Sequence, residues 1–85
     1  MSELDVLRKD IDRLDKEIAE LLLSRCAVVK EIGAVKKRDS LPITNAGREE
    51  EVIAKVRSLA LDADEKDALE TAYRAIITAS KGLEK

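Results

Sequence analysis

Apolar residues recur along the first half of the chain at alternating spacings of three and four. They are Leu4, Leu7, Ile11, Leu14, Ile18, Leu21, Val28, Ile32 and Val35, which we call the apolar stripe. This spacing is typical of a heptad repeat, in which such residues share one face of a helix. The pattern predicts one long helix over about residues 2–38, which Ser2 with Asp5 is suited to cap. Another element must cover the stripe.

One position of the stripe is polar, because Arg25 lies four residues after Leu21 and three before Val28. A buried charge without a partner is costly, so this guanidinium must leave the stripe or bind an anion. Lys36 lies about 16 Å farther along the helix, at ~1.5 Å per residue. Both side chains are long enough to converge on one small anion, so we predict an anion site between them.

Arg8 also flanks the stripe, but it lies about 25 Å from Arg25 along the same helix. The two can meet only if Arg8 comes from an antiparallel copy that crosses near Ile18. A compact monomer of 85 residues would measure roughly 30 Å across, whereas the helix would be on the order of 50 Å long. We therefore expect a homodimer in which the long helices run antiparallel.

The rest of the chain predicts two shorter helices, which makes 1–85 a single all-α domain of three helices. Pro42 falls within a predicted loop over residues 39–44, Asn45 is suited to cap the second helix, and Asp62 with Glu65 can cap the third. The apolar residues expected to face inward are Val52, Ile53, Val56, Leu59 and Ala60 on the second helix and Leu69, Ala72, Tyr73, Ile76 and Leu83 on the third.

Polar residues accompany these inward faces. Glu49 precedes Ile53 by four residues, so it shares the inward side as a partner for a cation or as an acceptor for a ligand. Arg48 beside it fits a surface ion pair or the same pocket equally well. Ser80 follows Ile76 by four residues, and Glu84 follows Ser80 by four, which places both on the inner side of the third helix.

Composition excludes several classes of function. The net charge of −2, with 40% charged residues, lacks the basic excess of a nucleic-acid binder, and no apolar run is long enough for a membrane span. The chain has no histidine, so histidine-based triads are excluded and no metal site is expected. Cys26 is the only cysteine and the N-terminus lacks signal-peptide features, so we expect a cytoplasmic protein.

In order and spacing, these residues resemble those of the all-helical chorismate mutases. The likeness rests on Arg8, Arg25, Lys36, Pro42, Arg48, Glu49, Ser80 and Glu84 and covers nearly the whole chain. The resemblance implies an intertwined dimer of three-helix chains. It also implies an isomerase of aromatic amino-acid biosynthesis that converts chorismate to prephenate by a [3,3] rearrangement without a cofactor.

The resemblance further implies roles for single residues. Arg25 and the partner's Arg8 would hold the two carboxylates, with help from Ser80. Lys36 would reach the ether oxygen and a carboxylate, where a cation stabilises the charge that develops as the C–O bond breaks. Glu49 would accept a hydrogen bond from the ring hydroxyl.

Two positions depart from the common pattern of that family. Asn45 stands where Asp is frequent, in a role that depends largely on the backbone. Glu84 stands where Gln commonly donates a hydrogen bond to the ether oxygen. An ionised carboxylate cannot donate, so Glu84 would have to be protonated to act in the same way.

Two other functions remain open on the sequence. An isochorismate-pyruvate lyase on the same scaffold would also need arginines for two carboxylates, and assays of both substrates would distinguish it. A non-catalytic helical dimer or regulatory module would instead require an acidic partner for Arg25 and no ligand site.

Overall fold

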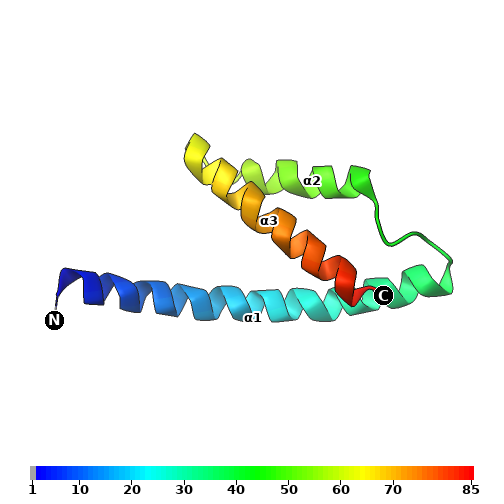
Figure 1. The fold of residues 1–85 in the computed structure, drawn as a ribbon, viewed down its shortest axis with the longest axis horizontal. Coiled ribbons are helices and arrows are strands. Elements are labelled where there is room, and N and C mark those ends of the chain that lie inside the picture. Colours follow the sequence, from blue (N-terminus) through cyan, green and yellow to red (C-terminus); the bar gives the residue numbers. More distant parts are fainter. Residues whose placement is uncertain (1) are drawn as a thin grey trace.

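The computed structural model describes residues 2–85, which form three helices and no strand (Figure 1). The helices are α1 (Glu3–Arg38), α2 (Ala46–Arg57) and α3 (Ala63–Leu83). The prediction of one long and two shorter helices is therefore confirmed; Met1, which belongs to the predicted domain, lies outside the described residues.

Each helix begins where the sequence predicts a cap, because a side-chain oxygen binds backbone N–H groups that the first turn leaves unpaired. Ser2 Oγ accepts from the N–H of Asp5 at 3.1 Å. Asn45 Oδ1 accepts from the N–H of Arg48 at 3.0 Å. Asp62 Oδ1 accepts from the backbone N–H groups two and three residues farther along the chain, at 2.7 and 3.1 Å.

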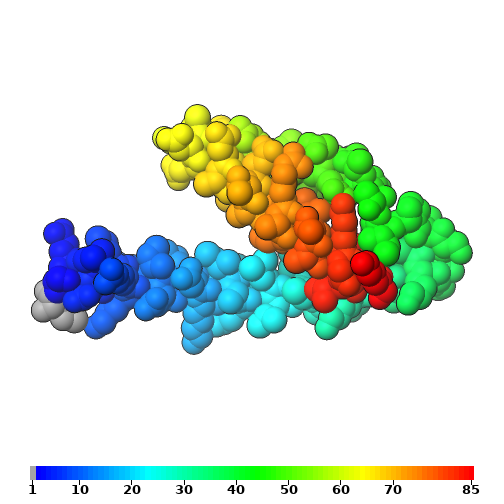
Figure 2. Space-filling model, in the orientation of Figure 1, coloured from blue at the N-terminus to red at the C-terminus, as the bar shows by residue number. Residues whose placement is uncertain are grey.

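The helices α2 and α3 form an antiparallel hairpin that lies over the C-terminal half of α1 (Figure 1). The end of α3 reaches α1, whereas the N-terminal half of α1 projects from the molecule as a bare arm (Figure 2). The chain measures 56 × 26 × 15 Å. The buried apolar core is correspondingly small and consists of Val29, Ile53, Val56 and Ile77.

The apolar stripe does not contribute to this core, because its residues are between 41% and 71% exposed in the single chain. The helix α1 instead buries Val29 and Gly33, which lie on the neighbouring face. The chain therefore covers one face of α1 with its own α3 and leaves the stripe exposed.

Some of the predicted inward positions are wrong. Leu59 is 78% exposed because α2 ends at Arg57, two residues earlier. Ala72 and Leu83 are exposed, and the residue of α3 that is most buried is Ile77, which the pattern did not select. The helix α3 packs on both α1 and α2. Its buried face is therefore set by two neighbouring helices and includes Ile77.

Candidate active site

A cavity of about 730 Å³ opens between the C-terminal half of α1, the loop before α2, the start of α2 and the end of α3. This volume is within the range of small-molecule sites. Its polar and charged side chains come from all three helices and the loop: Arg25, Lys36, Thr44, Asn45, Arg48, Glu49, Ser80, Lys81 and Glu84. The cavity therefore contains every residue predicted for the site except Arg8.

Lys36 and Glu84 meet at one end of the cavity. Lys36 Nζ lies 2.6 Å from Glu84 Oε1, and it also donates to the carbonyl oxygen of Ile43 at 2.8 Å. The side chains of Lys36 and Glu84 are only 21% and 9% exposed. An ammonium group has three N–H donors, so one remains for a ligand while Lys36 holds both the loop and the end of α3.

Gly33 explains how the end of α3 comes so close to α1. A Cβ atom at this position would lie 2.8 Å from Glu84 Cα and 2.9 Å from the Glu84 carbonyl oxygen, closer than real Cβ atoms approach. The glycine therefore provides the close helix approach that brings the Glu84 side chain to Lys36, one helical turn farther along α1.

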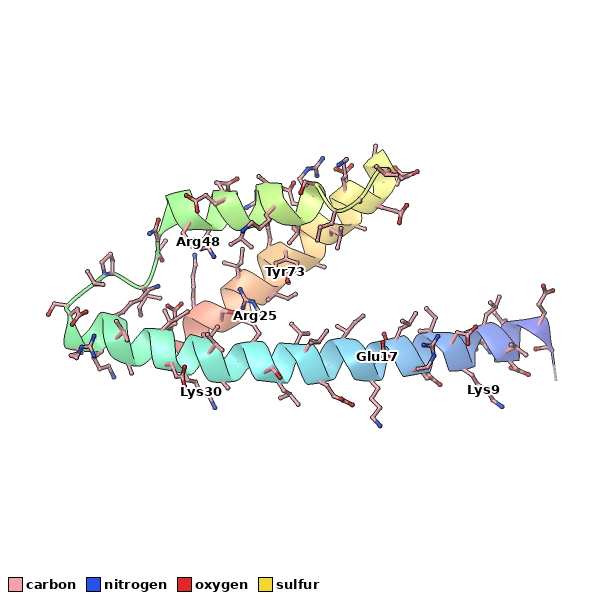
Figure 3. The ribbon with its side chains drawn as sticks, turned by 180° about the vertical axis from the view of Figure 1, so that it is seen from behind. Lys9, Glu17, Arg25, Lys30, Arg48 and Tyr73 are labelled. Carbon is pink, nitrogen blue, oxygen red and sulfur yellow. The ribbon has the colours of Figure 1, made fainter. Side chains whose placement is uncertain are left out.

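Arg25 extends from α1 towards the α2–α3 hairpin (Figure 3). Its Nη1 donates to Ser80 Oγ, and this hydroxyl donates in turn to the carbonyl oxygen of Ile76 at 2.8 Å. No carboxylate in residues 2–85 forms an ion pair with Arg25, although the side chain is half-buried. A guanidinium has five N–H donors, so most of them remain available for an anion.

The start of α2 supplies three of the predicted residues. Glu49 faces the cavity and accepts from Lys81, with 2.8 Å between Oε2 and Nζ. Arg48 lies at the edge of the cavity in an exposed ion pair with Glu51 at 3.3 Å, which is the surface role that the sequence left open. Asn45 lines the cavity, and its side chain caps α2.

Lys81 is the charged cavity residue that the sequence did not predict. Its position contained a signal, because it follows Ile77 by four residues and precedes Glu84 by three, on the face of α3 that carries Ser80. A lysine near a helix C-terminus is usually a solvent-exposed residue that interacts favourably with the helix dipole. The position of Lys81 was therefore not distinctive in the sequence.

Arg8 lies on the projecting arm of α1, away from the cavity. Its side chain is 68% exposed, and its nearest described partner is Asp5, at 3.9 Å. The single chain therefore does not bring Arg8 to the other site residues, as the length of helix between Arg8 and Arg25 predicts.

Four cations and two carboxyl groups line the cavity, which leaves two net positive charges when both carboxyl groups are ionised and three when Glu84 is protonated. This balance suits a small dianion, and forked guanidinium groups match carboxylates in shape. Within residues 2–85 no cluster of His, Cys, Asp or Glu side chains could hold a metal ion, and no helix is long and apolar enough to cross a membrane. The arrangement can bind two acidic groups and place an ammonium group next to a third oxygen.

Comparisons with known proteins agree with this chemistry. Residues 7–85 match the family model for chorismate mutase type II. All of the chain aligns with the bifunctional chorismate mutase/prephenate dehydratase of Aquifex aeolicus, at 42% identity over 89 residues, and spans 25% of that relative's length. The chain thus corresponds to about a quarter of this curated relative.

Solved structures show the same fold over nearly the whole length of both chains. Chorismate mutase from Thermus thermophilus superposes with a TM-score of 0.89 at 31% identity, covering 98% of this chain and 94% of the other. A conserved hypothetical protein from Pyrococcus furiosus gives 0.83 at 30% identity, covering 100% and 99%. The family model, the relatives and the fold together establish that this chain belongs to the chorismate mutase type II family.

Proposed function

We propose that the protein catalyses the rearrangement of chorismate to prephenate in the biosynthesis of phenylalanine and tyrosine. The observation that carries the proposal is that Arg25, which has no carboxylate partner within residues 2–85, lies in a cavity that also holds the adjacent Lys36 and Glu84. Chorismate has two carboxylates and an ether oxygen. The carboxylates match the net positive charge of the cavity, and the ether oxygen matches the N–H of Lys36 that remains free for a ligand.

The substrate is held by its acidic groups and its hydroxyl. Arg25 binds one carboxylate with N–H groups that its hydrogen bond to Ser80 leaves available. Ser80 contacts the same carboxylate once its O–H turns from the carbonyl oxygen of Ile76 to the substrate. Glu49 accepts from the ring hydroxyl, while Asn45 and Arg48 close the cavity at the start of α2. Contacts at both ends of the substrate favour its compact pseudo-diaxial form, in which the atoms that bond are close together.

The reaction is intramolecular: the ether C–O bond breaks as a new C–C bond forms, so no oxidant, reductant or co-substrate is needed. Negative charge builds on the ether oxygen in the transition state, and the third N–H of Lys36 donates to this oxygen. A protonated Glu84 adds a second donor. Its Oε1 continues to accept from Lys36 at 2.6 Å while its other oxygen carries the proton to be donated.

We further propose that the active form is a homodimer. The chain exposes 6701 Å², whereas a compact monomer of its mass would expose about 5,000 Å². The excess is of the size that one subunit of an obligate homodimer buries. The exposed apolar stripe is the surface that a second copy would cover.

The register of the stripe supports a shared site. An antiparallel copy that pairs Ile18 with Leu21 also pairs Leu7 with Ile32 and Leu4 with Val35. Apolar residues therefore meet along the helix except at Arg25, which faces Leu14. Ile32 lies between the cavity and a neighbouring apolar hollow. Because Arg8 follows Leu7, this pairing brings the partner's Arg8 to the edge of the cavity.

An assay of purified protein tests the activity by following the loss of chorismate and the formation of prephenate. We expect Arg25→Ala to lower kcat/KM by at least about 100-fold, since it removes a charged contact to a carboxylate. Arg13→Ala, which removes an arginine outside the cavity, serves as the control. A wild-type protein that is folded and dimeric but converts no chorismate would refute the proposal.

Subunit mixing tests the shared site. Inactive Arg8→Ala and Arg25→Ala chains, allowed to exchange subunits, should recover activity because each mixed dimer contains one intact site. Sedimentation at micromolar concentration should show about twice the chain mass. Mixed dimers that form but stay inactive would show that Arg8 does not act across the interface.

A further inference from the structure

Lys81 lines the cavity, and the reaction as described above gives it no role. It lies on α3 directly after Ser80, and its Nζ is 2.8 Å from Glu49 Oε2. The side chains of Lys81 and Glu49 are 32% and 24% exposed, so the pair is largely shielded from water at the edge of the cavity.

We propose that Lys81 is a positioning residue that prepares Glu49 for a dianionic substrate. The inference rests on the proposed function, in which Glu49 accepts a hydrogen bond from the ring hydroxyl. Lys81 neutralises the carboxylate of Glu49 and directs one of its oxygens toward the substrate.

The first part of the argument is electrostatic. Without Lys81 the cavity would have one positive charge fewer, and the Glu49 carboxylate would face the substrate's two carboxylates without a counter-ion. Like charges in a partly shielded site repel each other more strongly than they do in water. Glu49 can therefore serve as an acceptor for the hydroxyl without weakening binding of the acid groups only if a cation accompanies it.

The second part is geometric. Lys81 engages Oε2 of Glu49, which leaves Oε1 to accept from the ring hydroxyl. The ion pair joins the start of α2 to the end of α3 across the cavity, so it also fixes the distance between the hydroxyl-binding end and the Lys36–Glu84 end.

A purely structural role would be redundant. Two further ion-pair groups already join α2 to α3 outside the cavity: Arg74 pairs with Glu50 at 3.3 Å, and Arg57 pairs with Glu70 at 3.0 Å. Ion pairs that are partly open to water contribute little to stability. The main consequence of the Lys81–Glu49 pair therefore lies in the cavity.

The test compares Lys81→Met with Lys81→Arg, which keeps the charge. We expect Lys81→Met to raise KM for chorismate about ten-fold and to lower kcat less than about three-fold, because the lost charge acts mainly on binding. Lys81→Arg should stay within about three-fold of wild-type KM. Lys30→Met is the matched control, since Lys30 is exposed and points away from the hairpin (Figure 3).

A double-mutant cycle then separates the proposed role from a direct contact. In a Glu49→Gln background the effect of Lys81→Met should fall below about two-fold, because no carboxylate remains to be neutralised. Where turnover is too slow for KM, the dissociation constant of a bicyclic dicarboxylate transition-state analogue, measured by calorimetry, replaces it.

Three results would overturn the inference. An undiminished effect in the Glu49→Gln background would mean that Lys81 contacts the substrate itself. A lower melting temperature with unchanged KM would mean that the pair only braces the helices. Wild-type protein without activity on chorismate would refute the proposed function together with the inference, whereas the first two results leave that function intact.

Discussion

Adding one methyl group at Gly33 should disable the Lys36–Glu84 end of the cavity while leaving the fold in place. The Cβ of Gly33→Ala would lie 2.8 Å from Glu84 Cα and 2.9 Å from its carbonyl oxygen. Both are backbone atoms, so no side-chain rotation relieves the contact. Ordinary carbon contacts are about 3.5–4.0 Å, so the end of α3 must retreat from α1 by about 1 Å.

This retreat acts directly on the geometry of the site. The distance between Lys36 Nζ and Glu84 Oε1 is 2.6 Å, and a displacement of about 1 Å takes the pair to the limit of a hydrogen bond. Misplacement of catalytic groups by about 1 Å can cost roughly 100-fold in rate. We therefore expect kcat to fall by about two orders of magnitude.

Stability should change much less than activity. Overpacking costs about 1–3 kcal/mol, but replacing a helical glycine by alanine returns up to about 1 kcal/mol of helix propensity. Circular dichroism should therefore show a native helix content, and a net cost of about 1 kcal/mol would lower the melting temperature by roughly 4–8 °C.

Gly82→Ala is the matched control, because a Cβ at Gly82 meets no atom within 4 Å. The same methyl group is added near the end of α3, but without the clash, so we expect near-wild-type kcat. Gly33→Ala should also cause no further loss in a Glu84→Ala background. If Gly33→Ala turns over chorismate within about two-fold of the Gly82→Ala protein, the close approach at Gly33 does not position Glu84.

Three further measurements test separate parts of the structure. If Glu84 donates to the ether oxygen, Glu84→Gln, which keeps a donor, should retain most of the wild-type kcat, whereas Glu84→Ala should lower kcat roughly 100-fold; equal kcat in the two variants would exclude this donor. Glu70 accepts from Arg74, and this hydrogen bond lowers the pKa of Glu70 below its ordinary value of 4.5. The stabilisation by Glu70 is therefore present above pH 4.5 and lost as pH falls through the lowered pKa. Glu70→Gln should have a lower melting temperature than wild type at neutral pH but not at about pH 2. The control Asp12→Asn should have the wild-type melting temperature at both pH values. Ile77→Ala should destabilise the chain by about 2–5 kcal/mol in urea unfolding, because it opens a void where α3 is buried; a change below about 1 kcal/mol would contradict the central place of Ile77 in the core.

The helices and most of the site could be predicted from the sequence because both depend on local spacing. The caps at Ser2, Asn45 and Asp62 are decided by contacts within a few residues, and all three form as predicted. Arg25 and Lys36 lie on one helix of fixed rise, so the fact that both line one cavity follows from their separation in the sequence.

The site residues of α3 could also be predicted from their spacing along one helix. Ser80 and Glu84 were placed on one face by their four-residue spacing, and both line the cavity. The spacing could not tell which residues of α1 they meet. That Ser80 binds Arg25, and Glu84 binds Lys36, depends on the crossing of α3 over α1.

Only the tertiary structure decides how the neighbouring apolar faces of α1 are used. Val29 and Gly33 pack under the hairpin of the same chain, whereas the stripe beside them stays exposed. The periodicity of the sequence shows which residues share a face of the helix. It does not show which element packs on that face. The ion pair between Lys81 and Glu49 has the same origin, because residues on two helices become partners only once the hairpin closes and sets their distance.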